Sequence, residues 1–236
     1  MVATAILLYT TPMTRPIALL VGISTLAAAS TGRAGGWETV ADEPDVKVLM
    51  RDVPGHNFPT IRAIAVLDES IYDVLAVLSD VNRYPKWMVR CAEARRLDKR
   101  GELEYVTYSR TDAPWPVSDR DAVYRARVRV KLSQKLVIVR FKAIKDARVP
   151  PRDGIVRLSK LSGYYALKIL GPRKTQLDYQ LYADPGGWIP KWVGRITAKS
   201  AVIDTIRALR KWVRKSHGRY AKRIARWKRM EKQLGK

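Results

Sequence analysis

Residues 177–193 read LDYQLYADPGGWIPKWV, and this stretch decides how the second half of the chain is built. Up to Ala183 apolar and polar residues alternate, which predicts a strand with one buried face. The segment DPGG (184–187) then combines a rigid proline with two residues that adopt positive φ without strain. Apolar residues recur at helical spacing from Thr197 onward. The stretch therefore predicts the corner at which a sheet passes the chain to a helix.

The segment after this corner predicts one long amphipathic helix, bent at Gly218. From Arg207 to the C-terminus there are thirteen Lys and Arg residues and one acid, Glu231. We expect the first half of the helix to cover the sheet. The second half extends beyond what a compact domain needs.

Short strand-like segments come before the corner, each bounded by turn residues. Their succession predicts an antiparallel meander rather than alternating strands and helices. The segments are ELEYVTYSR (102–110), RDAVYRARVRVK (120–131), KLVIVRFKAI (135–144), GIVRLSK (154–160), GYYALKIL (163–170) and TQLDYQLYA (175–183). Before these segments, residues 37–58 contain short β-like runs. They are followed by an expected helix that Asp68 caps and that ends near Asp80.

Alternation along these strands separates an inner face from an outer one. Arg125, Arg127 and Arg129 should face solvent. The inner positions include small or polar residues, which leave room for a hollow on a curved sheet. The inner set is Leu103, Tyr105, Thr107, Ser109, Tyr124, Ala126, Val128, Val130, Val137, Val139, Phe141, Leu177, Tyr179 and Leu181.

The N-terminal region is typical of a secretory signal peptide. Arg15 precedes an apolar run at 17–29 that ends in small residues, and the first acid is Glu38. We expect residues 1–34 to be a signal peptide cleaved after Ala29 or Ala34. The protein is then exported, to the periplasm as first choice and secreted as second. A membrane anchor is the alternative, for which the run is short.

The chain has 45 Lys and Arg residues against 22 Asp and Glu, a formal net charge of +23. Such a charge predicts attraction to anionic surfaces, either nucleic acid or anionic membrane. An exported protein rarely meets nucleic acid, so we expect the membrane. The single cysteine, Cys91, excludes an internal disulfide and is expected to be a small buried hydrophobe.

Four segments carry a resemblance to a known family. They are LSDVNRYPKWM (78–88), PWPVSDRDAVY (114–124), PPRDGIVRLSKLSGYYAL (150–167) and the opening stretch. In this order and spacing they resemble the START (StAR-related lipid transfer) domains of the Bet v 1-like helix-grip superfamily. The resemblance runs from about Glu38 to Val213.

The resemblance implies an α+β helix-grip fold, in which a curved antiparallel sheet wraps around a long C-terminal helix with a lipid-sized cavity between them. The domain is expected at 37–213, followed by a basic amphipathic helical extension at 214–236. Combined with the inner face, the resemblance predicts the cavity lining. This lining is Tyr105, Thr107, Trp115, Tyr124, Ala126, Val128, Val139, Phe141, Tyr179, Leu181, Val202, Ile206 and Leu209.

A second group of residues is expected to shape turns rather than perform chemistry. In WPVSDRD (115–121) we expect Arg120 to pair with an acid and Trp115 to pack at the cavity's edge. A catalytic role for its carboxylates is the alternative, although no nucleophile or base accompanies them. The structural set is Trp87, Arg120, Asp121, Asp184, Pro185, Gly186, Gly187, Trp188 and Pro190.

One departure from the family concerns an acid–arginine pair that some members hold inside the cavity. On this chain the two positions fall on Thr107 and Ala126, so both charges are absent together. Paired loss is physically reasonable, because one buried charge left alone is costly. It also weakens any inference, from the resemblance alone, of which ligand this chain binds.

The leading interpretation is a monomeric, non-enzymatic lipid carrier or sensor without a cofactor or metal. Its ligand would be a sterol, hopanoid-like lipid, fatty acid or phospholipid, and the C-terminal helix would gate the cavity. The basic helix would lie on an anionic membrane through Trp212, Lys222, Arg223, Arg226, Trp227 and Lys228. The alternatives are a helix-grip enzyme of the cyclase or hydrolase type and a basic nucleic-acid-binding protein.

Overall fold

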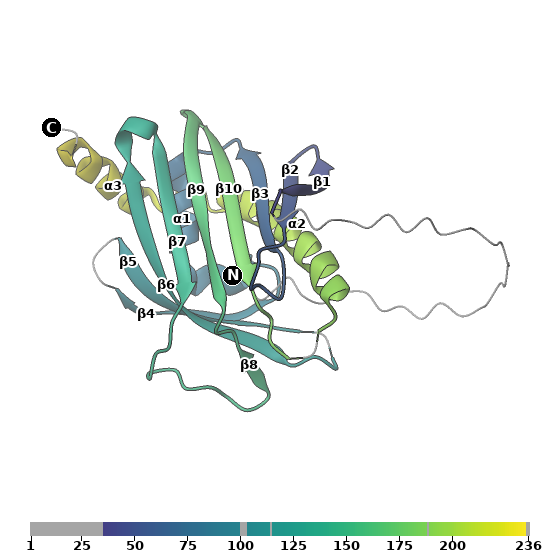
Figure 1. The fold of residues 1–236 in the computed structure, drawn as a ribbon. Helices are drawn as coiled ribbons and strands as arrows, with labels where there is room; N and C mark the ends of the chain where they lie inside the picture. The colour runs from purple at the N-terminus through teal and green to yellow at the C-terminus, as the bar shows by residue number, and fades with distance from the viewer. Residues whose placement is uncertain (1–34, 100–102, 114, 188, 235–236) are drawn as a thin grey trace, which may run out of the picture.

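The computed structural model describes residues 35–99, 103–113, 115–187 and 189–234. The expected signal peptide and its cleavage sites lie outside this range and remain predictions. Ten strands form one curved antiparallel sheet, with helices behind it (Figure 1). The strands are β1 (Glu38–Glu43), β2 (Val46–Arg51), β3 (Thr60–Leu67), β4 (Cys91–Lys99), β5 (Glu104–Thr111), β6 (Asp119–Lys131), β7 (Leu136–Ala143), β8 (Ile155–Arg157), β9 (Leu161–Gly171) and β10 (Lys174–Ala183).

The strand order is β1-β2-β3-β10-β9-β7-β6-β5-β4, and β8 runs parallel to the start of β6. All six predicted segments contain a strand, and five of them form the antiparallel meander; the sixth, β8, is a short strand parallel to β6. Two strands, β3 and β4, were not predicted. The pairing of β3 with β10 joins strands that are far apart in the sequence, and local patterns carry no information about such a contact. The α+β helix-grip prediction is confirmed.

The predicted inner face is buried over most of its length. Leu103 and Val130 are exceptions, with 52% and 46% of their surface exposed, because both lie near strand ends beyond the packed interior. The outer face is only partly solvated. Val106, Tyr108 and Val123 point outward by alternation, yet they are buried with Val149 in a second apolar cluster.

Three α-helices complete the domain: α1 (Ile71–Ser79), α2 (Lys191–Lys215) and α3 (Ala221–Leu234). Ser70 caps α1 by accepting from the backbone N–H of Asp73, so the prediction that Asp68 is the cap is wrong. The long C-terminal helix is also two helices rather than one bent helix. The break lies at Gly218, whose φ of +80° ends α2 and redirects the chain into α3.

Helix α2 packs along the inner face of the sheet, and α3 lies at the far end of the domain beside α1 (Figure 1). Between them, α2 and the sheet bury a single large core in which Val202, Ile206 and Leu209 are each at most 2% exposed. Among the described residues, none of the helices is both long enough and apolar enough to span a membrane.

Gly163 on β9 marks the tightest approach in the sheet. A Cβ at this position would lie 2.2 Å from the carbonyl oxygen of Gln180 and 2.6 Å from Cζ of Phe141. We expect Gly163→Ala to lower the free energy of unfolding by about 1–3 kcal/mol, as overpacking of a filled core does. Urea denaturation measures the change.

Gly171→Ala is the matched control on the same strand, because its nearest contact would be an ordinary 3.7 Å to Cβ of Lys174. It should change the unfolding free energy by less than about 0.5 kcal/mol. Equal losses for the two variants would contradict the close packing described for Gly163.

Candidate ligand-binding cavity

The interior under the sheet is filled largely by aromatic side chains. Tyr165 stacks on Tyr179 with ring centroids 4.5 Å apart, and Phe141 packs against both Tyr124 and Tyr165. A hollow of about 20 Å³ lies between them, room for about one water molecule. The predicted residues Tyr105, Tyr124, Ala126, Val139 and Phe141 line this hollow, together with Leu78, Tyr84 and Tyr165.

Some polar groups at or near this hollow lack a hydrogen-bond partner, although the hydroxyl of Tyr84 donates to the carbonyl oxygen of Leu78. The side-chain oxygens of Thr107, Tyr124 and Tyr165 are buried without a hydrogen bond of ordinary geometry among the described residues. Burial raises the pKa of both tyrosines, so each hydroxyl keeps its proton. The two positions of the missing acid–arginine pair, Thr107 and Ala126, are both buried. The interior is therefore neutral and close-packed.

Several predicted lining residues belong to the solid core instead of a cavity. Tyr179 and Leu181 of β10 pack in one buried cluster with the apolar residues of α2. Trp115 is 92% exposed, so the prediction that it packs at the cavity's edge is wrong. It follows β5 in the connection to β6, where no described element covers it.

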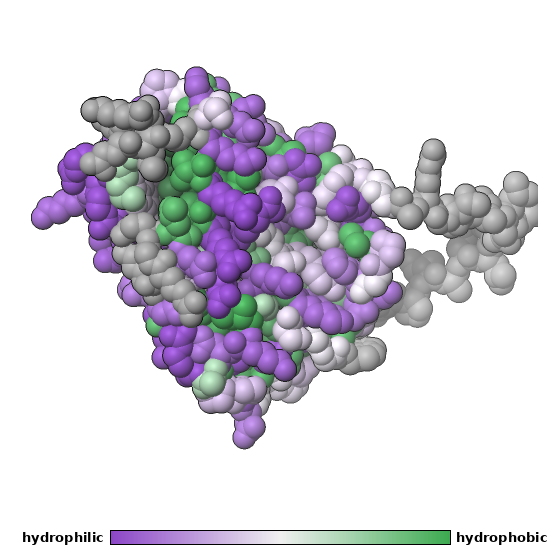
Figure 2. Space-filling view, turned by 60° about the vertical axis from the view of Figure 1, so that its left-hand side comes forward, coloured by the Kyte–Doolittle hydropathy of each residue, from purple (hydrophilic) through white to green (hydrophobic). Residues whose placement is uncertain are grey.

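A second, much larger cavity of about 740 Å³ lies at the end of the domain near α3. Its walls come from α1, from the ends of β5, β6, β7 and β9, and from α3. Apolar side chains make up most of the lining, and of the residues predicted to line the cavity only Tyr105 and Val128 reach it. Further apolar lining residues are Ile71, Leu75, Val137, Ile169, Trp227 and Met230. On the face shown in Figure 2, hydrophobic residues gather in a patch bordered by hydrophilic ones.

The charged residues around this cavity are all basic. Arg96, Arg129, Lys131, Lys135, Arg223 and Arg226 line it, and no acid does so among the described residues. Sequence patterns pointed to none of these as cavity residues, because Arg96 lies on the unpredicted β4 and Lys135 follows a turn. The cavity therefore combines an apolar body with a cationic rim.

Helix α3 lies over this cavity, with Ile224 and Trp227 packed against the core and polar contacts to the α1 region. Nη1 of Arg223 donates to the carbonyl oxygen of Ala76 and to Oγ of Ser79, at 3.4 and 3.1 Å. The hydroxyl of Tyr220 donates to Asp80 at 2.9 Å, and burial raises its pKa to about 12. Lys228 lies 5.0 Å from the centre of the Tyr72 ring. These polar contacts involve only α1 and its end.

Helix α2, in contrast, is tied to the N-terminal strands by charge pairs. Nε of Arg207 and Nη1 of Arg210 donate to Asp45 at 3.1 and 2.7 Å. Nη1 of Arg195 donates to Asp52 at 3.0 Å. Since α2 is both core-packed and paired in this way, α3 is the helix whose release costs less.

The corner between β10 and α2 has a structural role. Arg120 is 5% exposed, and its guanidinium donates to the carbonyl oxygens of Pro185 at 3.3 Å, of Gly186 at 3.5 Å and of Ser118. The prediction that Arg120 pairs with an acid is therefore wrong, because backbone carbonyls take the place of a carboxylate. Burial lowers the pKa of Arg120.

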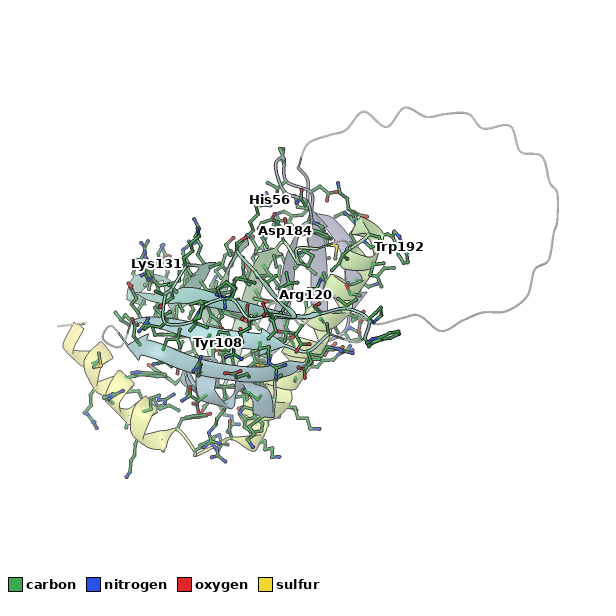
Figure 3. All side chains as sticks on the ribbon, turned by 90° about the horizontal axis from the view of Figure 1, so that it is seen from below. His56, Tyr108, Arg120, Lys131, Asp184 and Trp192 are labelled. Atoms are coloured by element: carbon green, nitrogen blue, oxygen red, sulfur yellow. The ribbon has the colours of Figure 1, made fainter. Side chains whose placement is uncertain are left out.

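Figure 3 shows Lys131, at the cationic rim, and Trp192, near this corner, at opposite sides of the molecule, so the corner is far from the cationic rim.

It is Asp121, the next residue, that forms the buried ion pair. Nε and Nη2 of Arg157 donate to its two carboxylate oxygens at 2.6 and 3.0 Å. This hydrogen bonding raises the pKa of Arg157. Asp184 accepts from the backbone N–H of Gly186 at 3.1 Å.

The remaining predicted structural residues also lie in or near this framework. Trp87 is 8% exposed and belongs to the core. Pro190 precedes α2 as its N-cap residue, whereas Gly186 and Gly187 both have positive φ, as the turn requires. Trp188 lies outside the described residues. Gly186, Gly187 and Pro190 shape the corner, and neither they nor Trp87 line either of the two cavities.

The groups that most often carry catalysis are dispersed. His56 stacks on Tyr182 with ring centroids 3.6 Å apart, and His217 lies in the break between α2 and α3. Cys91 is buried, as predicted, and burial raises its pKa. Within the described ranges there is no group of three or more His, Cys, Asp or Glu side chains that could hold a metal ion.

The residues predicted to contact a membrane divide into two sets. Lys222, Arg226 and Lys228 are exposed on α3. Arg223 and Trp227 instead turn partly toward α1 and line the cavity, and Trp212 packs against the core. These three residues pack against the domain, and their contact with a membrane stays a prediction.

Comparison with known proteins gives a consistent result. The model of the START domain matches residues 24–219. An uncharacterized protein of Pseudomonas aeruginosa is 33% identical over 193 residues, which cover 80% of this chain and 94% of that protein. The phosphatidylcholine transfer protein of Bos taurus is 26% identical over 170 residues, 70% of this chain and 78% of that protein.

Solved structures agree. A STAR-related lipid transfer protein from Xanthomonas axonopodis is 33% identical, with a TM-score of 0.69, and covers 76% of this chain and 99% of that chain. Human STARD10 has a TM-score of 0.71 at 19% identity, over 80% of this chain and 76% of that chain, which is a likeness of fold.

The contact between α2 and Asp45 predicts a pH dependence. Hydrogen bonding from Arg207, followed by that from Arg210, lowers the pKa of Asp45 from 3.8 to about 2. A lowered pKa stabilises the folded state above the ordinary value, and this stabilisation is lost as pH falls toward 2. We expect Asp45→Asn to lower the thermal midpoint at pH 6.

The difference between wild type and Asp45→Asn should shrink from pH 4 downward and be mostly lost by pH 2, measured by circular dichroism. Asp42→Asn is the control, because Asp42 forms only an exposed pair with Lys47. A difference that is unchanged between pH 6 and pH 2 would show that Asp45 acts through packing rather than charge.

Proposed function

The chain belongs to the START domain family, and from this premise we propose that it binds one lipid in the cavity near α3 and carries it between membranes. The observation that supports this proposal is the cavity of about 740 Å³, whose lining is mainly apolar. Its size lies within the ~300–1,000 Å³ typical of pockets that enclose small ligands. The protein acts as a monomeric carrier rather than an enzyme.

Burial of a hydrocarbon tail supplies the affinity. Each buried methylene contributes about 0.8 kcal/mol, so a tail of about twelve methylenes contributes on the order of 10 kcal/mol before binding costs. Tyr105, Val128 and Ile169 contribute to the wall that the tail would contact. The ligand classes that fit this chemistry are a fatty acid, a lysophospholipid, a sterol or a hopanoid-like lipid.

Loading requires α3 to move, in our proposal. Its attachment to the α1 region, through Arg223 and Lys228 and through Tyr220 just before the helix, leaves Lys222, Arg226 and Arg229 exposed. An anionic leaflet attracts such cations at about 1 kcal/mol each near the surface. The membrane would then draw α3 away from the cavity where the lipid has to be exchanged. The expected signal peptide supports a location outside the cytoplasm, with the periplasm first.

Blocking the cavity tests where the lipid binds. We expect wild-type protein purified from a lipid-rich bacterial host to retain one lipid per chain in native mass spectrometry. Ile169→Trp places a large ring in the cavity wall and should abolish retention. Leu170→Trp is the control, because Leu170 is 46% exposed, is not part of the lining and precedes the same turn.

Retention of the lipid by Ile169→Trp, or its loss from both variants, would contradict the proposed location. Protein that carries no lipid and instead retains nucleic acid at moderate salt would favour the nucleic-acid alternative. Lipid extraction from the same sample identifies the ligand.

The exposed face of α3 predicts binding to anionic vesicles. We expect Lys222→Gln/Arg229→Gln to weaken sedimentation with phosphatidylglycerol vesicles by roughly tenfold or more, at about 1 kcal/mol per residue. Lys142→Gln/Lys145→Gln removes the same charge from the β7 region and should have a smaller effect. If the two variants are weakened equally, net charge alone explains the binding and α3 is not the contact surface.

A further inference from the structure

We infer that the ligand of this cavity has an anionic headgroup, a phosphate or carboxylate, and that Arg96 and Arg223 together hold it beside Ser79. This inference rests on the proposed function and names the headgroup that the same cavity selects. Arg96 comes from β4 and Arg223 from α3, so the headgroup site forms only when α3 is in place.

Both guanidinium groups reach the same residue at the end of α1. Nη2 of Arg96 donates to the carbonyl oxygen of Ser79 at 2.7 Å. Nη1 of Arg223 donates to Oγ of Ser79 at 3.1 Å and to the carbonyl oxygen of Ala76 at 3.4 Å. The Arg96 guanidinium also lies over the Tyr105 ring, 4.1 Å from its centre. Arg96 and Arg223 are half-buried, and both line the cavity.

Two positive charges held together at a half-buried site repel each other unless an anion is present. Neither guanidinium contacts a carboxylate among the described residues. Asp80, the next residue after Ser79, is engaged by Tyr220 at 2.9 Å and by Arg83 at 3.3 Å. Other half-buried arginines of the chain do have carboxylates, as in Arg62 with Asp178 and Arg157 with Asp121.

Capping of α1 accounts for only part of this arrangement. Cations at a helix C-terminus interact favourably with its last carbonyl groups. A guanidinium has five N–H donors, however, and the described contacts use only one nitrogen of each group, Nη2 of Arg96 and Nη1 of Arg223. The donors left over match the oxygens of a phosphate or carboxylate, which guanidinium groups bind bidentately.

The size of the cavity narrows the lipid further. The cavity measures about 740 Å³, and pockets of ~300–1,000 Å³ typically enclose one small ligand. One acyl chain with a small headgroup fits, whereas a phospholipid with two long chains does not. Single-chain acids such as fatty acids and lysophosphatidic acid therefore match both volume and charge.

The headgroup site is a feature of this chain rather than of the family model. The START match ends at residue 219, two residues before α3 begins at Ala221. Arg223 and the other α3 residues of the lining thus lie outside the matched region. The C-terminal extension would supply both the lid and half of the charge that selects the ligand.

The test compares headgroups on one chain length by isothermal titration below the critical micelle concentration. The probes are oleoyl lysophosphatidic acid, oleoyl lysophosphatidylcholine, monooleoylglycerol and glycerol 3-phosphate. We expect wild type to bind lysophosphatidic acid at least tenfold more tightly than monooleoylglycerol. Glycerol 3-phosphate alone should not bind measurably, because it lacks the buried tail.

Arg96→Gln/Arg223→Gln should reduce this preference to threefold or less, while Arg223→Lys keeps a larger part of it than Arg223→Gln does. The matched control is Lys222→Gln/Arg229→Gln, which removes the same charge from the exposed face of α3 and should leave the preference unchanged. The ratio of two affinities within one variant is independent of the folded fraction, so a partly destabilised variant still gives an answer.

Equal binding of all three lipids by wild type would overturn the inference and leave the proposed function standing. Binding of none of them would contradict the proposed function as well. Glycerol 3-phosphate binding as tightly as lysophosphatidic acid would show a site for free phosphate esters and would also overturn the inference. Loss of the preference in the Lys222/Arg229 control would show that net charge, rather than the arginine pair, is responsible.

Discussion

The rest of the structure depends on the contact between the Arg120 guanidinium and the carbonyl oxygens of Pro185 and Gly186. It fixes the start of β6 to the corner from which α2 leaves the sheet. Because α2 begins at Lys191, only a few residues later, this corner sets the line along which the helix crosses the inner face. The buried pair of Asp121 and Arg157 holds the same region from the other side.

The position of α2 in turn decides where a ligand has room. Its apolar face and the aromatic side chains of the sheet fill the interior around a hollow of about 20 Å³. The larger space of about 740 Å³ lies at the end of the domain near α3. The two helices also differ in how they are attached to the domain. Ion pairs secure α2 to the N-terminal strands, whereas a few hydrogen bonds hold α3 to α1. A domain built in this way can open at one end without losing its core.

Much of the fold was predictable, because its signals are local. Alternation identified most inner residues of β5, β6, β7 and β10, and the DPGG segment identified the corner. The cavity was not predictable in the same way. The interior beneath α2 is filled because of how aromatic side chains such as Tyr165 and Tyr179 pack, and the cationic rim of the larger cavity depends on β4 and α3 meeting at Ser79. Such contacts join residues that are distant in sequence, and periodicity carries no information about them.

The central claim is that the lipid lies between α1, the sheet ends and α3, and not beneath α2. Photo-crosslinking with a fatty acid that carries a diazirine near its terminal methyl group tests this location directly. Peptide mapping by mass spectrometry should find the label on peptides containing Leu75, Val128 or Met230. Labelling of the α2 segment that contains Val202, Ile206 and Leu209 would contradict the account and would place the ligand beneath α2.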